Sequence, residues 1–373
     1  MHIQRLSFLN FKNYEQLNLE FCPGINCLIG DNGEGKTNIL DGLHYLSFCK
    51  SYFNPIDSQN ILHDHPFFVI QGTVSNEAGE DEIYCAQKRN QKKQFKRNKV
   101  EYSRLADHIG RYPMVMISPS DNDLIHEGSE SRRRFLDSVL SQFDSIYLDD
   151  LINYNKILSQ RNALLKKFAE TGRFLKDSIE IWDMQLIEFA QRIYLKRSRL
   201  IAEFIPVFQK YYEAISQGKE KVNINYQSHL LDTDFSEVLA KAIERDRALQ
   251  YTTVGTHKDD LEFTIRKQPV KKYGSQGQQK TYLIALKLAQ YEYMRNVMKK
   301  RPILLLDDIH DKLDENRVRG IMALVSQDQF GQIFITDTHP SRIALIFENN
   351  PAMSFKQYRI SNGTITPTHA TPQ

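Results

Sequence analysis

Residues 25–48 read INCLIGDNGEGKTNILDGLHYLSF, and this stretch decides the fold. It opens with a compact apolar run, residues 25–29, that stops at a glycine as a buried strand does before a turn. Residues 30–37 fit the pattern GxxxxGK[ST]. Apolar residues then recur at helical spacing through residues 39–48. A buried strand, a glycine-rich loop and an amphipathic helix in this order predict a phosphate-binding loop.

Each residue type in the loop suits the binding of phosphate. Glycines let backbone N–H groups curl around phosphate oxygens, and the following helix points its positive N-terminal end at them. Lys36 adds a point charge at the β- and γ-phosphates, and Thr37 offers its hydroxyl to Mg²⁺. We therefore expect ATP and Mg²⁺ as cofactors. The predicted nucleotide-binding residues are Gly30, Asp31, Asn32, Gly33, Glu34, Gly35, Lys36 and Thr37.

A second stretch supplies two adjacent acids. The apolar run at residues 303–306 predicts a buried strand, and Asp307 and Asp308 come directly after it. Asp307, at the carboxyl end of that strand, can hold the metal through water. Asp308 is placed to orient or deprotonate the attacking water, so we predict it, with Lys36, as a catalytic residue. The alternative is a solvated turn after a core strand.

A third stretch, residues 273–280, reads YGSQGQQK and leads into a strongly periodic helix. A small polar residue with glycine at a helix start is an anion-binding end. Ser275, Gly277 and Gln278 are therefore predicted to form a second phosphate-binding terminus. A plain helix cap is the alternative.

Length and composition narrow the class of protein. The chain has 373 residues, with 41% hydrophobic and 25% charged residues, which argues against disorder, collagen and disulfide scaffolds. No apolar run approaches the roughly 18 residues of a membrane span, and residues 1–15 contain no apolar signal core. We expect a cytoplasmic protein without a membrane partner. Four scattered cysteines, with no CxxC pair, argue against a zinc site.

The chain changes character along its length. Residues 67–102 and 114–117 read as strands, whereas about 124–249 read as helices with a break at Thr171-Gly172. Residues 254–265 return to strand. The polar residues after Ser361 include two prolines and are expected to be frayed.

Nucleic-acid affinity would need a local basic patch, because the net charge is only +3. Residues 88–99 carry seven positive side chains and no acid. We predict that Lys92, Lys93, Lys96 and Arg97 bind DNA phosphates; the alternative is a hairpin kept soluble by its charge. Arg132, Arg133 and Arg134 could also meet DNA, or instead brace two lobes.

The motif order resembles that of ATP-binding-cassette ATPases of the SMC-like branch. The similarity is closer still to the RecF family of bacterial recombination and gap-repair proteins. Five further segments carry it: LSFLNFKNYE (6–15), ISPSDNDLIHEGSESRRRFLD (117–137), YNKILSQRNALLK (154–166), VGTHKDDLEF (254–263) and GSQGQQKTYLIALKLA (274–289). The resemblance covers nearly the whole chain.

The resemblance implies an α/β fold, a P-loop ATPase head with two lobes. Lobe I would join residues 1–120 and 301–373 around a mixed sheet, and the inserted helical lobe II, residues 121–300, would carry the signature. In this family type the signature of one chain caps ATP held by the other. ATP would therefore drive head-to-head homodimerisation, and hydrolysis would release the dimer.

The same resemblance implies a weak DNA-dependent ATPase of recombinational gap repair and replication-fork maintenance. Its expected partners are duplex DNA, junctions of single- and double-stranded DNA, and the RecO and RecR mediators that help to load RecA. A transporter ATPase subunit would lack the long helical insert. A nuclease would need an extra acidic domain, and an SMC-type tether would need hundreds of coiled-coil residues.

The chain departs from the family pattern after the paired acids. Residues 309–314 read IHDKLD where a Phe-Ser-Glu-Leu-Asp type of sequence is more familiar, although Asp314 keeps its place. The next predicted strand is followed by Asp337, Thr338 and His339, any of which could face the γ-phosphate.

Overall fold

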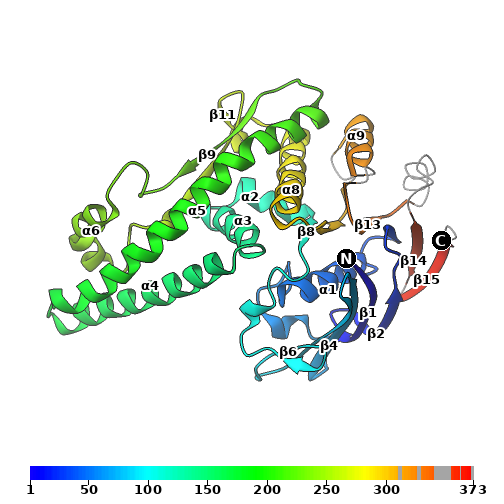
Figure 1. Ribbon diagram of the computed structural model, residues 1–373, viewed down its shortest axis with the longest axis horizontal. Coiled ribbons are helices and arrows are strands. Elements are labelled where there is room, and N and C mark those ends of the chain that lie inside the picture. Colours follow the sequence, from blue (N-terminus) through cyan, green and yellow to red (C-terminus); the bar gives the residue numbers. More distant parts are fainter. Residues whose placement is uncertain (310–312, 326–328, 340–353, 362, 371–373) are drawn as a thin grey trace. The chain divides into compact units, whose positions relative to one another are not determined.

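The computed structural model describes residues 1–309, 313–325, 329–339, 354–361 and 363–370. Residues 310–312, within the stretch that departs from the family pattern, lie outside these ranges. The chain divides into two compact units. In Figure 1 the colours follow the residue number, from blue at the N-terminus to red at the C-terminus. Unit 1 comprises Met1–Asn122, Tyr211–Gly218 and Ser275–Gln373. Unit 2 comprises Asp123–Lys210 and Lys219–Gly274.

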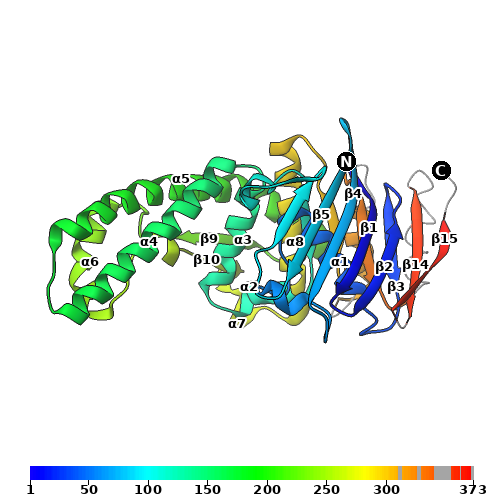
Figure 2. The same cartoon turned by 90° about the horizontal axis from the view of Figure 1, so that it is seen from below.

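An antiparallel sheet forms one layer of unit 1. Its strand order is β2-β1-β4-β5-β6-β7, and Figure 2 shows β5, β4, β1 and β2 side by side. Apolar and polar residues alternate along β1, so one face of the sheet is buried and the other is in solvent. The strands are β1 (His2–Phe11), β2 (Tyr14–Glu20), β4 (Phe67–Asn76), β5 (Gly79–Lys88), β6 (Gln94–Arg97) and β7 (Val100–Glu101).

A second sheet, mostly parallel, forms the other layer. Its order is β15-β14-β3-β13-β12-β8, and only β15 runs antiparallel to its neighbour. The strands are β3 (Ile25–Ile29), β8 (Met114–Ile117), β12 (Ile303–Leu306), β13 (Ile333–Asp337), β14 (Phe355–Ser361) and β15 (Thr364–Ala370). Every residue of β3, β8, β12 and β13 is buried, as apolar runs covered on both faces require. The predicted mixed sheet is confirmed.

Helix α1 (Lys36–Phe48) joins the two layers. It contacts β1, β4 and β5 of the antiparallel sheet and β8 and β13 of the other. Its apolar residues share one core with both sheets, and Leu40 and Leu43 are fully buried. The residue that opens this helix is therefore held by packing from two sides.

The expectation of a frayed C-terminus is wrong for the residues that the structure describes. Strand β15 pairs with β14 from Ser361↔Thr364 to Lys356↔Ala370. Proline is tolerated here because β15 is the edge strand, where an N–H on the outer side has no ladder partner to lose. Pro367 lies next to a shift in register between Gln357 and Tyr358.

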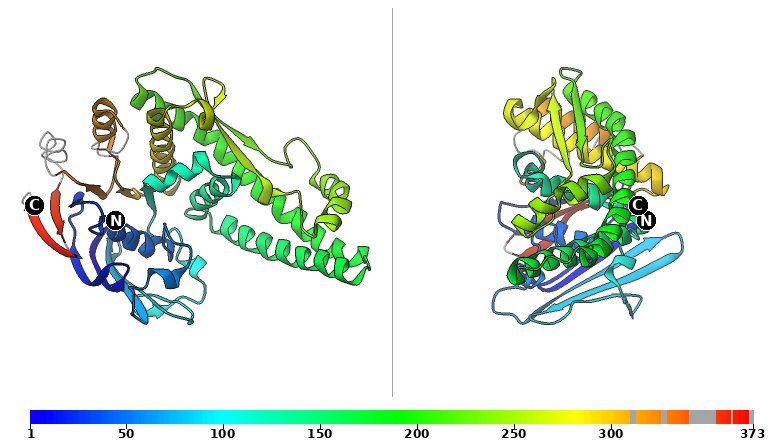
Figure 3. Two further views of the ribbon diagram at one scale, coloured as in Figure 1. Left: turned by 180° about the vertical axis from the view of Figure 1, so that it is seen from behind. Right: turned by 90° about the vertical axis from the view of Figure 1, so that its left-hand side faces the viewer.

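Unit 2 is mainly helical. Its long helices are α4 (Ser145–Thr171) and α5 (Lys176–Ser216), of which α5 belongs to unit 2 as far as Lys210. The two helices meet near Gly172, as the predicted break requires (Figure 3). A three-stranded sheet of order β11-β10-β9 was not predicted in full, because β9 (Val222–Gln227) lies within a stretch that reads as helix. The other elements are α2 (Asp123–His126), α3 (Ser129–Ser141), α6 (Phe235–Leu249), the 3₁₀ turn η4 (Thr256–Lys258), β10 (Asp260–Ile265), β11 (Gln268–Pro269) and α7 (Val270–Tyr273).

Helix α8 (Gln276–Met298) groups with unit 1, whereas we expected it in the inserted lobe. It is buried continuously from Lys280 to Met294 and contacts β8 and the 3₁₀ turn η3 (Pro119–Asn122). A helix that is buried over so many consecutive residues belongs to a core. The remaining elements of unit 1 are η1 (Asp57–Asn60), η2 (Leu105–Asp107) and α9 (Glu315–Val325). Among the described residues, none of the helices has both the length and the apolarity to cross a membrane.

Two fully buried arginines hold unit 2 together. Arg161 donates to Asp183 and to Asp246, each at 2.6 Å, and Asp246 is itself fully buried. Arg197 pairs with Asp259 at 2.7 Å and with Asp137 at 2.8 Å. Buried charges persist only when they are paired and hydrogen-bonded. Loss of either arginine would therefore leave carboxylates without their cation.

The substitution Arg161→Ala should destabilise unit 2 by about 3–5 kcal/mol, because it leaves the Asp246 carboxylate buried without its cation. Urea unfolding followed by circular dichroism measures the change. Arg199→Ala is the matched control, since Arg199 is 81% exposed and its ion pair is with Glu203, one helical turn away. Equal stability of the two variants would contradict the assignment of the Arg161 cluster as an anchor.

Candidate nucleotide-binding site

The glycine-rich loop lies at the carboxyl end of β3, and α1 begins at Lys36. Gly35 caps the helix in the left-handed region, at φ +102. A Cβ atom at Gly35 would lie 2.5 Å from Asn13 Nδ2 and 2.6 Å from Tyr14 Oη. Glycine is therefore required for both its conformation and its space. The turn between β1 and β2 covers the loop at this point, a contact that the sequence did not indicate.

The Lys36 side chain lies across the loop. Its ammonium Nζ donates to the carbonyl oxygens of Gly30 at 2.6 Å and Asp31 at 2.8 Å. Burial lowers the pKa of Lys36, and the carboxylates of Asp308 and Asp307 oppose that shift. Asp31, Asn32 and Gly33 are exposed along the rim of the loop. The Lys36 ammonium is thus held by the carbonyls of the loop itself.

The two residues predicted to hold a metal are brought together. The Thr37 hydroxyl donates to Asp307, 3.0 Å from Oδ1 and 3.1 Å from Oδ2, across 270 positions of sequence. Burial raises the pKa of the Asp307 carboxyl, although hydrogen bonds from Thr336 and Thr37 act in the opposite direction. A buried carboxylate that keeps its charge in such a place needs a cation.

These donors fit Mg²⁺. A hydroxyl and one carboxylate are the hard oxygen ligands that Mg²⁺ takes from a protein when nucleotide phosphates and water complete its shell. In the described ranges, no group of three or more His, Cys, Asp or Glu residues forms a separate metal site. Thr37 and Asp307 are therefore the residues that would hold the ion.

Asp308 leaves the strand in a rare conformation. Its φ is +45, in the left-handed region that residues other than glycine seldom adopt. Its backbone N–H donates to Thr336 Oγ1 at 2.9 Å, and the Thr336 hydroxyl donates to Asp307 Oδ1 at 2.9 Å. Thr336 was not among the residues predicted from the sequence. A lone hydroxyl within the apolar strand β13 is the signal that could have found it.

The three residues at the end of β13 differ in their surroundings. Asp337 is buried, and its Oδ1 accepts from the N–H of His339 at 2.8 Å. His339 is exposed. Thr338 lines a pocket of about 330 Å³ together with Gly30 and Asp31, next to the loop. That one of these three residues faces a γ-phosphate stays a prediction.

Ser275 is the exposed N-cap of α8. Its Oγ accepts from the N–H of Gln278 at 3.3 Å, and Gln278 Oε1 accepts from the N–H of Ser275 at 2.7 Å. This capping box is the plain role that the sequence allowed. The carbonyl of Gly277 accepts from the Thr281 hydroxyl within the first turns. The anion-binding role of Ser275, Gly277 and Gln278 stays a prediction.

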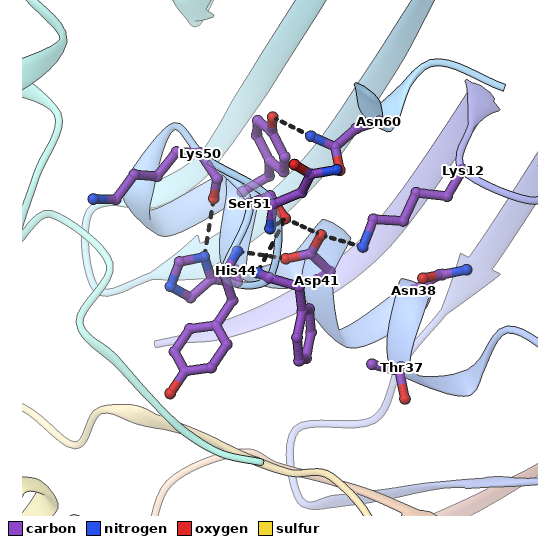
Figure 4. Close-up of polar contacts among 12 residues, drawn as sticks. Lys12, Thr37, Asn38, Asp41, His44, Lys50, Ser51 and Asn60 are labelled. Atoms are coloured by element: carbon purple, nitrogen blue, oxygen red, sulfur yellow. Dashed lines mark hydrogen bonds and ion pairs between the residues drawn. The ribbon is translucent and has the colours of Figure 1, made fainter. Parts of the chain in front are cut away.

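A buried polar network around Asp41 holds α1 in place (Figure 4). The carboxylate of Asp41, on α1, accepts from Lys12 at 2.6 Å, from the Ser51 hydroxyl at 2.6 Å and from the backbone N–H of Tyr52 at 2.7 Å. The Tyr52 hydroxyl in turn hydrogen-bonds to Asp121 and lies 3.0 Å from Nζ of Lys287 on α8.

Lys287 completes the connection, because its Nζ lies 2.7 Å from Asp121 Oδ1. An unbroken chain of polar contacts therefore runs from the phosphate-loop helix to the helix that begins at Ser275.

The basic hairpin contains two kinds of cation. Lys93 pairs with Asp57 at 2.6 Å and is only 10% exposed, and Arg97 pairs with Asp81 at 2.9 Å. Lys92 is exposed, and Lys96 lies over the Tyr84 ring at 5.7 Å. The charges of Lys93 and Arg97 therefore already stabilise the fold, which leaves Lys92 and Lys96 as the better candidates for contact with phosphate.

The three consecutive arginines act mainly inside unit 2. Arg132 forms a two-pronged pair with Asp260 at 2.6 and 3.0 Å, and Arg133 donates to the carbonyl of Asp259 at 2.8 Å. Arg134 pairs with Glu130 on the exposed side of the same helix. Arg132 and Arg133 thus brace α3 against the turn before β10.

Removal of the Lys36 charge should weaken ATP binding by roughly 10- to 100-fold, the range for one lost charge-assisted contact. Isothermal titration of Lys36→Ala with ATP and Mg²⁺ measures the loss. Lys166→Ala, an exposed lysine on α4, is the control and should bind like the parent. An unchanged affinity in Lys36→Ala would mean that residues 30–37 are not the phosphate site.

Comparisons with known proteins agree with this geometry. The RecF/RecN/SMC N terminal domain matches residues 2–362. The DNA replication and repair protein RecF of Phocaeicola vulgatus is 52% identical over 98% of each chain. The RecF of Flavobacterium johnsoniae is 49% identical over 97% of this chain and 100% of that protein.

Solved structures resemble this chain in the same way. The recombination mediator protein RecF with ATP, from the RecFOR pathway, has a TM-score of 0.88 and 31% identity, and covers 99% of this chain and 98% of its own. An Smc head domain from Pyrococcus furiosus, bound to the C-terminal domain of ScpA, has a TM-score of 0.58. At 16% identity over 98% of this chain and 96% of that one, it shows the fold alone.

Proposed function

Since this chain belongs to the RecF family, we propose that it is an ATP-dependent DNA-binding protein of recombinational gap repair and replication-fork maintenance. The observation that supports this best is the convergence of Lys36, Thr37 and Asp307 at the carboxyl ends of parallel strands. In open α/β sheets this edge is where ligands bind. The solved RecF structure with ATP adds support from a relative.

In this proposal the loop and the two acids divide the work of hydrolysis. The backbone of residues 30–37 and Lys36 hold the phosphates, and Thr37 and Asp307 hold Mg²⁺. The bound ion supplies charge to stabilise the transferring phosphoryl group. Asp308 orients the attacking water or takes its proton. The expected activity is a weak DNA-dependent ATPase that acts as a switch.

ATP binding should drive head-to-head dimerisation. Ser275 is exposed at the start of α8, which it caps. In the dimer this helix N-terminus would meet the γ-phosphate held by the other copy. The dimer would bind duplex DNA near single-strand gaps, and hydrolysis would release it. RecO and RecR would then load RecA.

The dimer itself is tested with Ser275→Arg. The substituted protein should fold and bind ATP through its own Lys36, but it should stay monomeric because a bulky cation occupies the position of the partner's γ-phosphate. Light scattering with and without ATP measures the mass. Tyr273→Arg, two residues earlier and 64% exposed, is the control for added charge. A normal ATP-dependent dimer of Ser275→Arg would contradict the composite site.

The DNA surface is tested by the double substitution of Lys92 and Lys96 with Ala. The slope of log affinity against log salt should flatten by about 2, since each lost contact with duplex DNA contributes about 0.9. A titration series with labelled duplex at several salt concentrations measures the slope. The matched control replaces Lys299 and Lys300, which are exposed at the end of α8.

An unchanged slope and affinity in that double variant would leave the hairpin as a feature of solubility. The variants of Lys93 and Arg97 are less decisive, because they also break ion pairs with Asp57 and Asp81.

A further inference from the structure

We propose that the hydroxyl of Thr336 positions Asp308 for water activation by holding the two adjacent acids in one arrangement. This inference rests on the proposed hydrolysis of ATP at this site. Thr336 is a positioning residue, because its hydroxyl acts through Asp307 and the backbone of Asp308, which it contacts directly.

The Thr336 hydroxyl connects the carboxylate of Asp307 to the backbone of Asp308. Thr336 Oγ1 accepts from the N–H of Asp308 and donates to Oδ1 of Asp307, with both heavy-atom distances at 2.9 Å. A hydroxyl has one proton to donate. Since that proton goes to the carboxylate of Asp307, the lone pairs of Oγ1 are left for the N–H of Asp308. The direction of both bonds is therefore fixed.

The Thr336 side chain accepts a backbone hydrogen bond just beyond the last paired residues of β12 and β13. Strands β12 and β13 pair as far as Leu306↔Ile335. Asp307 still donates its backbone N–H to Ile117 on the other neighbour, at 2.8 Å. At Asp308 the chain turns away with φ +45, and its N–H meets the Thr336 side chain instead of a strand. The bridge thus sets where the chain leaves the sheet.

Two properties of threonine make this anchor stiff. Its β-branch restricts rotation about χ1, and Thr336 is fully buried among the strands. Left-handed backbone at a residue with a side chain persists only where the surroundings impose it. Without the hydroxyl, the Asp308 N–H loses its partner and the backbone is released toward ordinary φ values.

Thr336→Val should therefore slow hydrolysis and leave nucleotide binding nearly intact. A misplacement of about 1 Å in a reacting group can cost roughly 100-fold, so we expect a loss of about 10- to 100-fold in the single-turnover rate. The affinity for ATP with Mg²⁺ should change by less than about threefold, because Thr37 still donates to Asp307. Thr336→Ser, which keeps the hydroxyl, should restore most of the rate.

A double-mutant cycle separates positioning from general damage. Asp308→Asn alone should slow hydrolysis by roughly 100-fold or more, as the loss of a general base does. If Thr336 acts through Asp308, adding Thr336→Val to Asp308→Asn should cost less than about threefold more. Fully multiplicative losses would overturn the inference, since they would assign Thr336 an independent role.

The controls distinguish the outcomes. Thr264→Val removes another buried hydroxyl, on β10 in unit 2, and should hydrolyse ATP like the parent. Thr336→Ala repeats the test without the second branch if valine disturbs the strand, and the same loss is expected. Slow hydrolysis by Asp308→Asn with a parental rate for Thr336→Val and Thr336→Ala overturns this inference alone. A parental rate for Asp308→Asn overturns the proposed role of Asp308 and this inference with it.

Discussion

A carboxylate buried at the end of an apolar strand is the constraint on which unit 1 depends. Asp307 follows four fully buried residues of β12 and is itself 3% exposed. Such a group is unfavourable unless donors and a cation surround it. Thr37 comes from the helix after the phosphate loop, and Thr336 comes from the neighbouring strand. The sheet order β3-β13-β12 is what brings these three together.

The same constraint explains the packing around α1. A loop can present its backbone N–H groups to phosphate only if the helix behind it does not shift. Core contacts with both sheets and the buried hydrogen bonds of Asp41 both hold that helix in place. The position of the site therefore depends on the packing around α1 as well as on the residues of the loop.

The parts of the fold that were predictable are those in which one short pattern determines one element. Residues 25–29 and 303–306 contain only strand-forming runs, and the GxxxxGK[ST] pattern after the first run predicts a loop and a helix. Thr336 was missed because its role depends on Asp308, a neighbour in space 28 positions away. β9 was not predicted, because it lies in a stretch whose pattern favours helix and its pairing with β10 depends on residues more than 30 positions later. β15 was expected to fray because the edge position that tolerates Pro367 is a property of the sheet.

The polar chain from Asp41 through Tyr52 and Asp121 to Lys287 has a consequence for assembly. It ties the helix after the phosphate loop to the helix that begins at Ser275, so each copy contributes both halves of the proposed composite site as one preformed body. Little conformational freedom is left to lose when two such bodies meet. Bound nucleotide would then join two preformed surfaces, and the lifetime of the dimer would depend on how long the ATP between them stays unhydrolysed.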